Sequence, residues 1–269
     1  MSGSALALTL CAAALHAGWN VLLAGSRRPE VATTAVLGVG LALFVAPAVL
    51  TWDVEAAAVP YIVASSALEL VYLVLLGAAY ARAEMTVVYP VARGFAPVLV
   101  VLATALAGTH PSAASTLGAI TVCVGVLVVR ATSVRGAGLG LALAVTIAGY
   151  TLVDHEGVQH AAPIPYLLLV LLPVTVAATL RVLLRGESAA LRDELGWRAV
   201  AAGSASFGAY ALVLAALERA PAAAVAAVRE TSIAIAVLLG ALVLREPVGR
   251  RRAVGALCIA AGAALAAAG

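Results

Sequence analysis

Long apolar stretches follow one another along almost the whole chain, separated by short polar breaks. Each stretch has about 20 residues, the length an α-helix needs to cross roughly 30 Å of hydrocarbon. The apolar positions run continuously and do not alternate with polar ones, as they would in a membrane β-barrel. The pattern predicts ten membrane-spanning helices, at residues 4–23, 31–51, 60–81, 85–107, 112–130, 136–154, 163–181, 197–217, 221–243 and 251–268.

Composition agrees with this pattern and excludes several classes of protein. Of the 269 residues, 64% are hydrophobic and 11% are charged, with a mean hydropathy of +1.10. A soluble domain is nearer half apolar and a quarter charged. A soluble enzyme, a disulfide scaffold and a nucleic-acid-binding domain are therefore excluded. We expect a multi-pass protein of the plasma membrane that contacts lipid, with no nucleic-acid partner and no cofactor.

The two halves of the chain repeat each other. Gly118 and Gly125 in the fifth span have counterparts 137 residues later, at Gly255 and Gly262 in the tenth. Further pairs in the same order are Arg93 and Arg229, Ser66 and Ser204, Tyr72 and Tyr210, and His110-Pro111 and Glu246-Pro247. This repetition predicts two domains, residues 1–131 and 132–269, each with five spans.

An odd number of spans per repeat inserts the second copy into the membrane from the opposite side. The expected fold is therefore an all-α membrane protein whose ten transmembrane helices form two inverted five-helix repeats. Secondary transporters use this arrangement, because two equivalent halves can exchange shapes and open a central site first to one side and then to the other.

Several motifs resemble those of the EamA family in the drug/metabolite transporter superfamily. They are Ala14-Leu15-His16-Ala17-Gly18-Trp19-Asn20, Tyr89-Pro90-Val91-Ala92-Arg93-Gly94, Tyr150-Thr151-Leu152-Val153-Asp154, Arg229-Glu230-Thr231-Ser232 and Leu244-Arg245-Glu246-Pro247. The resemblance covers nearly the whole chain. It implies transport of a small solute, often export, through a cavity lined by helices one, three, four, six, eight and nine.

The deepest charged residues of the predicted spans are Glu69, Arg93, Arg229 and Glu230, with Asp154 near a span end, and His16 joins them. A charge at the bilayer centre costs roughly 2.5–3.5 kcal/mol, so residues of this kind usually serve a function. The three acids and two arginines sum to −1 when His16 is neutral. Because lipid penalises a net buried charge, we expect the site to take up one proton or another cation. Protonation of His16 or of one acid would couple protons to solute movement.

Helical spacing groups these residues with polar and aromatic neighbours. His16 shares a helix face with Trp19 and Asn20, which follow it by three and four positions. Arg229 and Glu230 are adjacent and diverge by about 100°, so one should face the cavity and the other a neighbouring helix. The predicted solute-binding residues are His16, Trp19, Asn20, Glu69, Tyr72, Tyr89, Arg93, Tyr150, Asp154, Tyr210, Arg229 and Glu230.

Structural roles compete with these assignments. The arginines could pair with the acids to hold helices together, and Asp154 could cap the sixth helix. Tyr61 and Tyr166, at span starts, are expected in the aromatic belt at the membrane interface. The repeated glycines favour close helix packing, either within one chain or at a homodimer contact. A metal site at residues 154–160, which include two histidines, is a weak alternative.

The leading hypothesis is a secondary transporter of a small polar or amphipathic metabolite, acting as an exporter. The alternatives are a flippase for a lipid-linked intermediate and, less favoured, a membrane-embedded enzyme that would use residues 154–160. Arginines concentrate in the turns after the odd-numbered spans, which places those turns in the cytoplasm and both termini outside. Members of the EamA family usually have both termini in the cytoplasm, so both orientations stay open.

Overall fold

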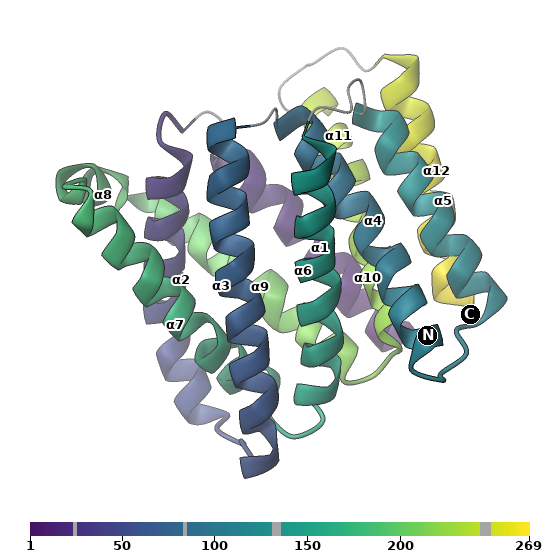
Figure 1. Ribbon diagram of the computed structural model, residues 1–269, viewed down its shortest axis with the longest axis horizontal. Helices are drawn as coiled ribbons and strands as arrows, with labels where there is room; N and C mark the ends of the chain where they lie inside the picture. Colours follow the sequence, from purple (N-terminus) through teal and green to yellow (C-terminus); the bar gives the residue numbers. More distant parts are fainter. Residues whose placement is uncertain (24–25, 83–84, 131–135, 243–248) are drawn as a thin grey trace.

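A computed structural model describes residues 1–23, 26–82, 85–130, 136–242 and 249–269. These residues form a bundle of helices that lie side by side (Figure 1). The helices are α1 (Gly3–Leu23), α2 (Pro29–Leu50), η1 (Ala56–Ala58), α3 (Val59–Arg82), α4 (Met85–Leu106), α5 (Ala113–Arg130), α6 (Ala137–Gly157), α7 (Pro163–Leu184), α8 (Ser188–Glu194), α9 (Trp197–Leu217), α10 (Ala222–Arg229), α11 (Thr231–Leu242) and α12 (Arg250–Ala268).

The all-α class predicted from sequence is confirmed. Within the described residues, nine helical segments are long and apolar enough to cross a membrane, and α5 adds a shorter apolar helix. The helix ends lie within a few residues of the predicted span ends. The short helices η1 and α8 were not predicted, because both fall in polar connections that lack a long apolar period.

The ninth predicted span is two helices, α10 and α11, that meet at Glu230. At the junction the amide of Glu230 donates to the carbonyl of Ala227 at 3.2 Å, three residues back. The hydroxyl of Thr231 donates to the carbonyl of Val228 at 2.7 Å. Bonds of the three-residue type and a hydroxyl that competes for a carbonyl both interrupt an α-helix. The break therefore falls at the two charged residues of this span.

Helices from the first half of the sequence pack against helices from the second half. Among the described elements, α1 packs on α9, α3 and α4 pack on α6, and α2 contacts both α7 and α9. In Figure 1, α5 and α12 lie together on one side of the bundle, and α2 and α7 lie with α8 on the other. The central helices, including α1, α4, α6 and α10, therefore occupy the middle of the molecule.

The repeated glycines bring α5 and α12 into close contact. A Cβ atom on Gly118 would lie 2.6 Å from the carbonyl oxygen of Gly262, and one on Gly125 would lie 2.8 Å from that of Gly255. Only residues without a side chain allow two helix backbones to approach so closely. The close packing predicted for these glycines is thus found within one chain.

The two ends of the bundle are closed differently. At one end Val54, after α2, forms an isolated antiparallel β-bridge with Ala161, before α7. The amide of Ala162 donates to the carbonyl of Asp53 at 2.7 Å. We call this the bridged end. The opposite end, where α1 is followed by α2 and α7 by α8, is called the arginine-rich end and carries Arg27, Arg28, Arg181, Arg185 and Arg192.

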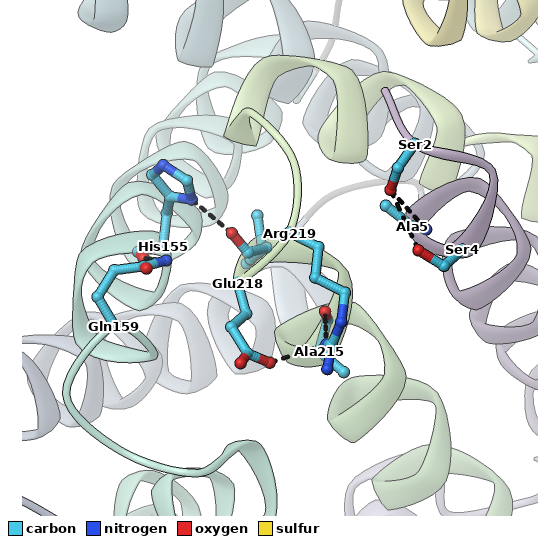
Figure 2. A network of polar contacts seen from close by, with 9 residues as sticks. Ser2, Ser4, Ala5, His155, Gln159, Ala215, Glu218 and Arg219 are labelled. Atoms are coloured by element: carbon cyan, nitrogen blue, oxygen red, sulfur yellow. Dashed lines mark hydrogen bonds and ion pairs between the residues drawn. The ribbon is translucent and has the colours of Figure 1, made fainter.

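Figure 2 shows further polar contacts at the bridged end. The ring nitrogen Nδ1 of His155, in the last turn of α6, lies 2.8 Å from the carbonyl oxygen of Leu217 at the end of α9. Glu218 and Arg219, directly after α9, form an exposed ion pair at 2.8 Å. The contact of His155 with Leu217 joins the ends of α6 and α9 at the bridged end.

Candidate functional site

A cavity of about 470 Å³ lies among the central helices. It extends from Glu69 and Tyr210 in the middle of the bundle to Ser26 and Pro29 at the arginine-rich end. The predicted site residues that line it are His16, Trp19, Asn20, Glu69, Tyr72, Tyr89, Arg93, Tyr150, Tyr210 and Arg229. The other two predicted residues, Asp154 and Glu230, lie behind this lining, each in contact with a residue that lines it.

Arg93 is held by two partners on the broken span. Its Nε lies 2.9 Å from Oε2 of Glu230, and its Nη2 donates to the hydroxyl of Ser232 at 3.0 Å. The side chains of Arg93 and Glu230 are 8% and 0% exposed. A charge-assisted contact of this length is a strong interaction in a dry environment. The pair therefore connects α4 directly to the junction between α10 and α11.

Arg229 has the opposite arrangement. It lines the cavity and is only 8% exposed, yet its Nε has no hydrogen-bond partner. Within the described ranges no carboxylate forms an ion pair with it. A buried guanidinium without an ion-pair partner is costly, and its donors are available to a bound anionic group. Arg229 and Glu230 thus diverge as adjacent helical positions should.

Asp154 is buried beneath the cavity, at 1% exposure, and accepts three hydrogen bonds. Its Oδ1 accepts from the hydroxyls of Ser65 at 2.6 Å and Tyr166 at 3.0 Å. Its Oδ2 accepts from the hydroxyl of Tyr210 at 2.7 Å. The interface assignment of Tyr166 was wrong, since this ring is fully buried. The position of Tyr166 at the start of a span did not indicate that its hydroxyl contacts Asp154 on the neighbouring helix α6.

Tyr210 also links Asp154 to a second acid. Its hydroxyl lies 3.3 Å from Oε1 of Glu69 and 2.7 Å from Oδ2 of Asp154. Glu69 comes from α3, Asp154 from α6 and Tyr210 from α9. Three helices therefore meet at one phenol group at the closed inner end of the cavity.

The wall formed by α1 is organised around His16. The indole Nε1 of Trp19 donates to Nδ1 of His16 at 3.3 Å, and the two rings lie edge to face with centroids 5.2 Å apart. The side-chain amide of Asn20 donates to the carbonyl oxygen of His16 at 2.7 Å. The shared face predicted from the spacing of these residues therefore lines the cavity.

Tyrosines form much of the remaining wall. The ring of Tyr150 lies 6.4 Å from that of Tyr72 and the same distance from that of Tyr210, between centroids. The guanidinium carbon of Arg93 lies 6.0 Å from the ring centroid of Tyr89, within the range of a cation–π contact. These rings surround the polar groups with flat apolar surface inside the bundle.

Residues 154–160 do not assemble into a metal site. Asp154 faces the buried hydroxyls, whereas His155 contacts the backbone of α9. His160 lies 3.3 Å from Oε2 of Glu55 and stacks on Tyr61, with ring centroids 5.9 Å apart. No group of three or more ligating side chains is found within the part of the chain that the structure describes.

Sequence reasoning missed Ser65, Tyr166 and Ser232 as partners of the buried charges. A signal existed for Ser65, which precedes Glu69 by four residues and so shares its helix face. No comparable signal existed for Tyr166 and Ser232, because each reaches its partner only through tertiary packing.

This fold and this cavity define a multi-pass membrane protein with a polar site inside its helical bundle. The chain belongs to the EamA-like transporter family, a non-enzymatic family of the drug/metabolite transporter superfamily, which matches residues 134–268. The matched residues lie entirely within the range predicted for the second repeat, residues 132–269. The motif at residues 244–247 lies outside the described residues.

A solved structure titled only as the crystal structure of a protein is similar over 99% of this chain and 98% of that chain. Its TM-score is 0.78 and its sequence identity 18%, so the likeness concerns the fold alone. No curated protein matches the chain at a significant level.

Proposed function

We propose that this chain is a secondary transporter that carries a small polar or amphipathic metabolite across the plasma membrane by alternating access. The observation that carries the proposal is the cavity of about 470 Å³ with the unpaired guanidinium of Arg229 in its wall. A buried charge that forms no ion pair and faces a cavity is costly to the fold and is typical of a binding site. A scaffold protein would gain nothing from it.

The packing of the helices supports an inverted-repeat architecture. If α1 corresponds to α6 and α3 to α9, the contact between α1 and α9 corresponds to that between α6 and α3, and both occur. Likewise the contact of α2 with α9 corresponds to that of α7 with α3. We therefore propose that the ten spans form two inverted repeats, with α10 and α11 together as one span.

The glycine contacts follow the same exchange. The sequence repeat relates Gly118 to Gly255 and Gly125 to Gly262. Exchanging the halves converts the contact between Gly118 and Gly262 into that between Gly255 and Gly125, and both contacts are close. A pseudo-twofold axis between α5 and α12 accounts for this reciprocity.

Alternating access requires the two ends of the bundle to open in turn. At the bridged end, backbone hydrogen bonds join the loop before α3 to the turn before α7. At the arginine-rich end the joining contacts are between side chains: the hydroxyl of Ser26 lies 3.3 Å from Oε1 of Glu194, and Glu30 forms ion pairs with Arg181 at 2.6 Å and Arg185 at 2.7 Å. The cavity extends to this second end. We propose that the structure represents the state open toward the arginine-rich end.

The lining favours a solute with an anionic group and an apolar body. The planar guanidinium of Arg229 suits a carboxylate or phosphate, to which it can donate two parallel hydrogen bonds. Tyr72, Tyr150 and Trp19 offer aromatic surface for the remainder of the solute. A flippase would need a lateral opening toward lipid, whereas this cavity extends to loop residues at the end of the bundle.

Arginine distribution favours export. The positive-inside rule places the arginine-rich end in the cytoplasm, so the cavity would load its solute there and release it outside. Ser2 and Ser188 are exposed at opposite ends. In a background without Cys11, Cys123 and Cys258, a membrane-impermeant maleimide should label Ser2→Cys in intact cells and Ser188→Cys only after permeabilisation. The reverse pattern would overturn the direction of transport and leave the carrier mechanism standing.

The transport proposal is tested by comparing metabolites inside and outside cells with and without the protein. Cells that express it should deplete an anionic metabolite and accumulate that compound in the medium. Arg229→Gln should abolish the difference. Arg219→Gln is the matched control, because Arg219 pairs with its neighbour Glu218 at the surface. A metabolite profile that is the same with and without the protein, or that Arg229→Gln leaves unchanged, would contradict the proposal.

A further inference from the structure

We propose that Glu69 and Asp154 form a proton-binding site at the inner end of the cavity, in which the two acids share a single proton through the hydroxyl of Tyr210. This inference rests on the proposed transport function only for its consequence, which is that a proton accompanies or opposes the solute. The site itself follows from the arrangement of donors and acceptors.

The first argument is a count of protons. The hydroxyl of Tyr210 has one hydrogen to donate and lies near two carboxyl groups. The shorter distance, 2.7 Å to Asp154, assigns that hydrogen to Asp154. A hydrogen bond across the remaining 3.3 Å then needs a hydrogen on Glu69, which the oxygen of Tyr210 can accept. If Glu69 were ionised, its carboxylate would face an oxygen that has no hydrogen to offer it.

The second argument removes His16 as the holder of the extra proton. Nδ1 of His16 accepts a hydrogen bond from the indole N–H of Trp19, and an indole can only donate. A charged imidazolium carries a hydrogen on both ring nitrogens and cannot accept this bond. His16 is therefore neutral in this arrangement, and the proton that the cavity requires must lie on an acid.

The third argument concerns the groups that surround Glu69. Its only hydrogen-bond partner among the described residues is Tyr210, and no cation lies within ion-pair distance of it. The titratable and charged groups on the surrounding elements are His16 on α1, Tyr72 on α3, Tyr89 and Arg93 on α4, Tyr150 and Asp154 on α6, Tyr166 on α7, Tyr210 on α9 and Arg229 on α10. Arg93 is already neutralised by Glu230.

The charges then balance. With a proton on Glu69, Arg93 cancels Glu230, and Arg229 is the one remaining positive charge opposite Asp154. A site without net charge is the least costly in a lipid environment. Of the two acids, Asp154 better stabilises a negative charge, because it accepts hydrogen bonds from three hydroxyl groups. The partner of Glu69 is Tyr210, whose hydrogen already goes to Asp154.

The same geometry gives the proton a short path. Glu69 can pass its hydrogen to the oxygen of Tyr210 while Tyr210 passes its own hydrogen to Oδ2 of Asp154. The phenol is unchanged at the end of the exchange, and one proton has moved from α3 to α6. The movement takes the proton from a residue that lines the cavity to one that is buried behind it toward the bridged end.

The experiment is infrared spectroscopy of the purified full-length chain in lipid nanodiscs, titrated with pH, because a protonated carboxyl group absorbs separately from a carboxylate. We expect a protonated-carboxyl band at neutral pH in the wild type and its loss in Glu69→Gln. Glu156→Gln, an exposed acid two residues after Asp154, should retain the band. Tyr210→Phe should shift it, because the hydrogen-bond partner of the acid is removed.

A second measurement uses the wild type and so avoids variants that fail to fold. A pH-indicator dye should report release of a single proton per chain as the band disappears on raising the pH. A band that survives in Glu69→Gln, a band lost in His16→Gln, or a wild type without a band overturns the proposal. A band without solute transport leaves the proton site standing and contradicts the proposed function. Transport by a protein that lacks the band contradicts the proton site and leaves the proposed function standing.

Discussion

Nε of Arg93 lies 2.9 Å from Oε2 of Glu230, and this contact joins the middle of α4 to the junction between α10 and α11. Arg93 and Arg229 stand at corresponding positions of the sequence repeat, yet Arg93 forms an ion pair and Arg229 forms none among the described residues. We therefore expect the pair at Arg93 to have a structural role, and we propose Arg229 as the residue that meets a solute.

Loss of one member of the buried pair should destabilise the protein. Glu230→Gln leaves Arg93 buried without a counter-charge, and breaking such a pair costs about 3–5 kcal/mol. We expect a marked fall in the melting temperature of the purified protein. The double variant Arg93→Met with Glu230→Leu should recover much of the loss, because it removes both buried charges. A double variant whose loss of stability equals the sum of the losses in Arg93→Met alone and Glu230→Leu alone would contradict a direct interaction between the two residues.

Replacement of Arg229 should have the opposite balance of effects. Arg229→Gln removes a buried charge that forms no ion pair among the described residues, so the melting temperature should fall much less than in Glu230→Gln. Export of the anionic solute should be lost, and Arg229→Lys should restore it only in part, because an ammonium group lacks the planar pair of donors. A fall in the melting temperature as large as that of Glu230→Gln would show that Arg229 has a structural partner.

Fixing the bridged end should stop transport. Paired residues in an antiparallel bridge have Cα atoms about 4.5–5.5 Å apart, a separation that a disulfide can span. In a background without native cysteines, oxidation of Val54→Cys with Ala161→Cys should abolish transport, and a reductant should restore it. Val54→Cys alone should be insensitive to oxidant. Full transport by the cross-linked protein would exclude opening at this end.

The contact between α5 and α12 should not tolerate a single added methyl group. Gly118→Ala would place a carbon 2.6 Å from the backbone nitrogen of Ala266, and overpacking of this kind costs about 1–3 kcal/mol. Gly38→Ala in α2 is the matched control, because a Cβ there meets nothing within 4 Å. The control should be neutral or stabilising by up to about 1 kcal/mol, since alanine favours a helix. Thermal unfolding of both variants distinguishes them.

Much of the fold could be predicted because apolar length alone determines where a chain crosses a membrane. The ends of α9 at Trp197 and Leu217 match the predicted span. The break at Glu230 could not be predicted from apolar length, because residues 221–243 form one long apolar segment that is interrupted only by a few polar residues around Arg229 and Glu230. It depends on the hydroxyl of Thr231 and on the partner that Arg93 offers to Glu230.

The candidate site could be predicted from the sequence where a residue is energetically costly to place inside a membrane. Charged residues inside apolar spans need a compensating environment, and this reasoning located Glu69, Asp154 and Arg229. The same reasoning could not tell which residue lines the cavity and which lies behind it, because helix rotation is set by packing between segments far apart in sequence. Tyr166 shows this limit, since its position at a span start resembles that of an interface tyrosine.

The glycine contacts between α5 and α12 also provide a fixed frame of reference. Leu117, Ile120 and Val124 are about half exposed on the outer face of α5, away from the cavity. Spin labels on that face would be attached to α5, which is held by close backbone contact with α12. Distances measured from them would report how far each remaining helix travels during turnover, in ångströms, without the identity of the cargo being known.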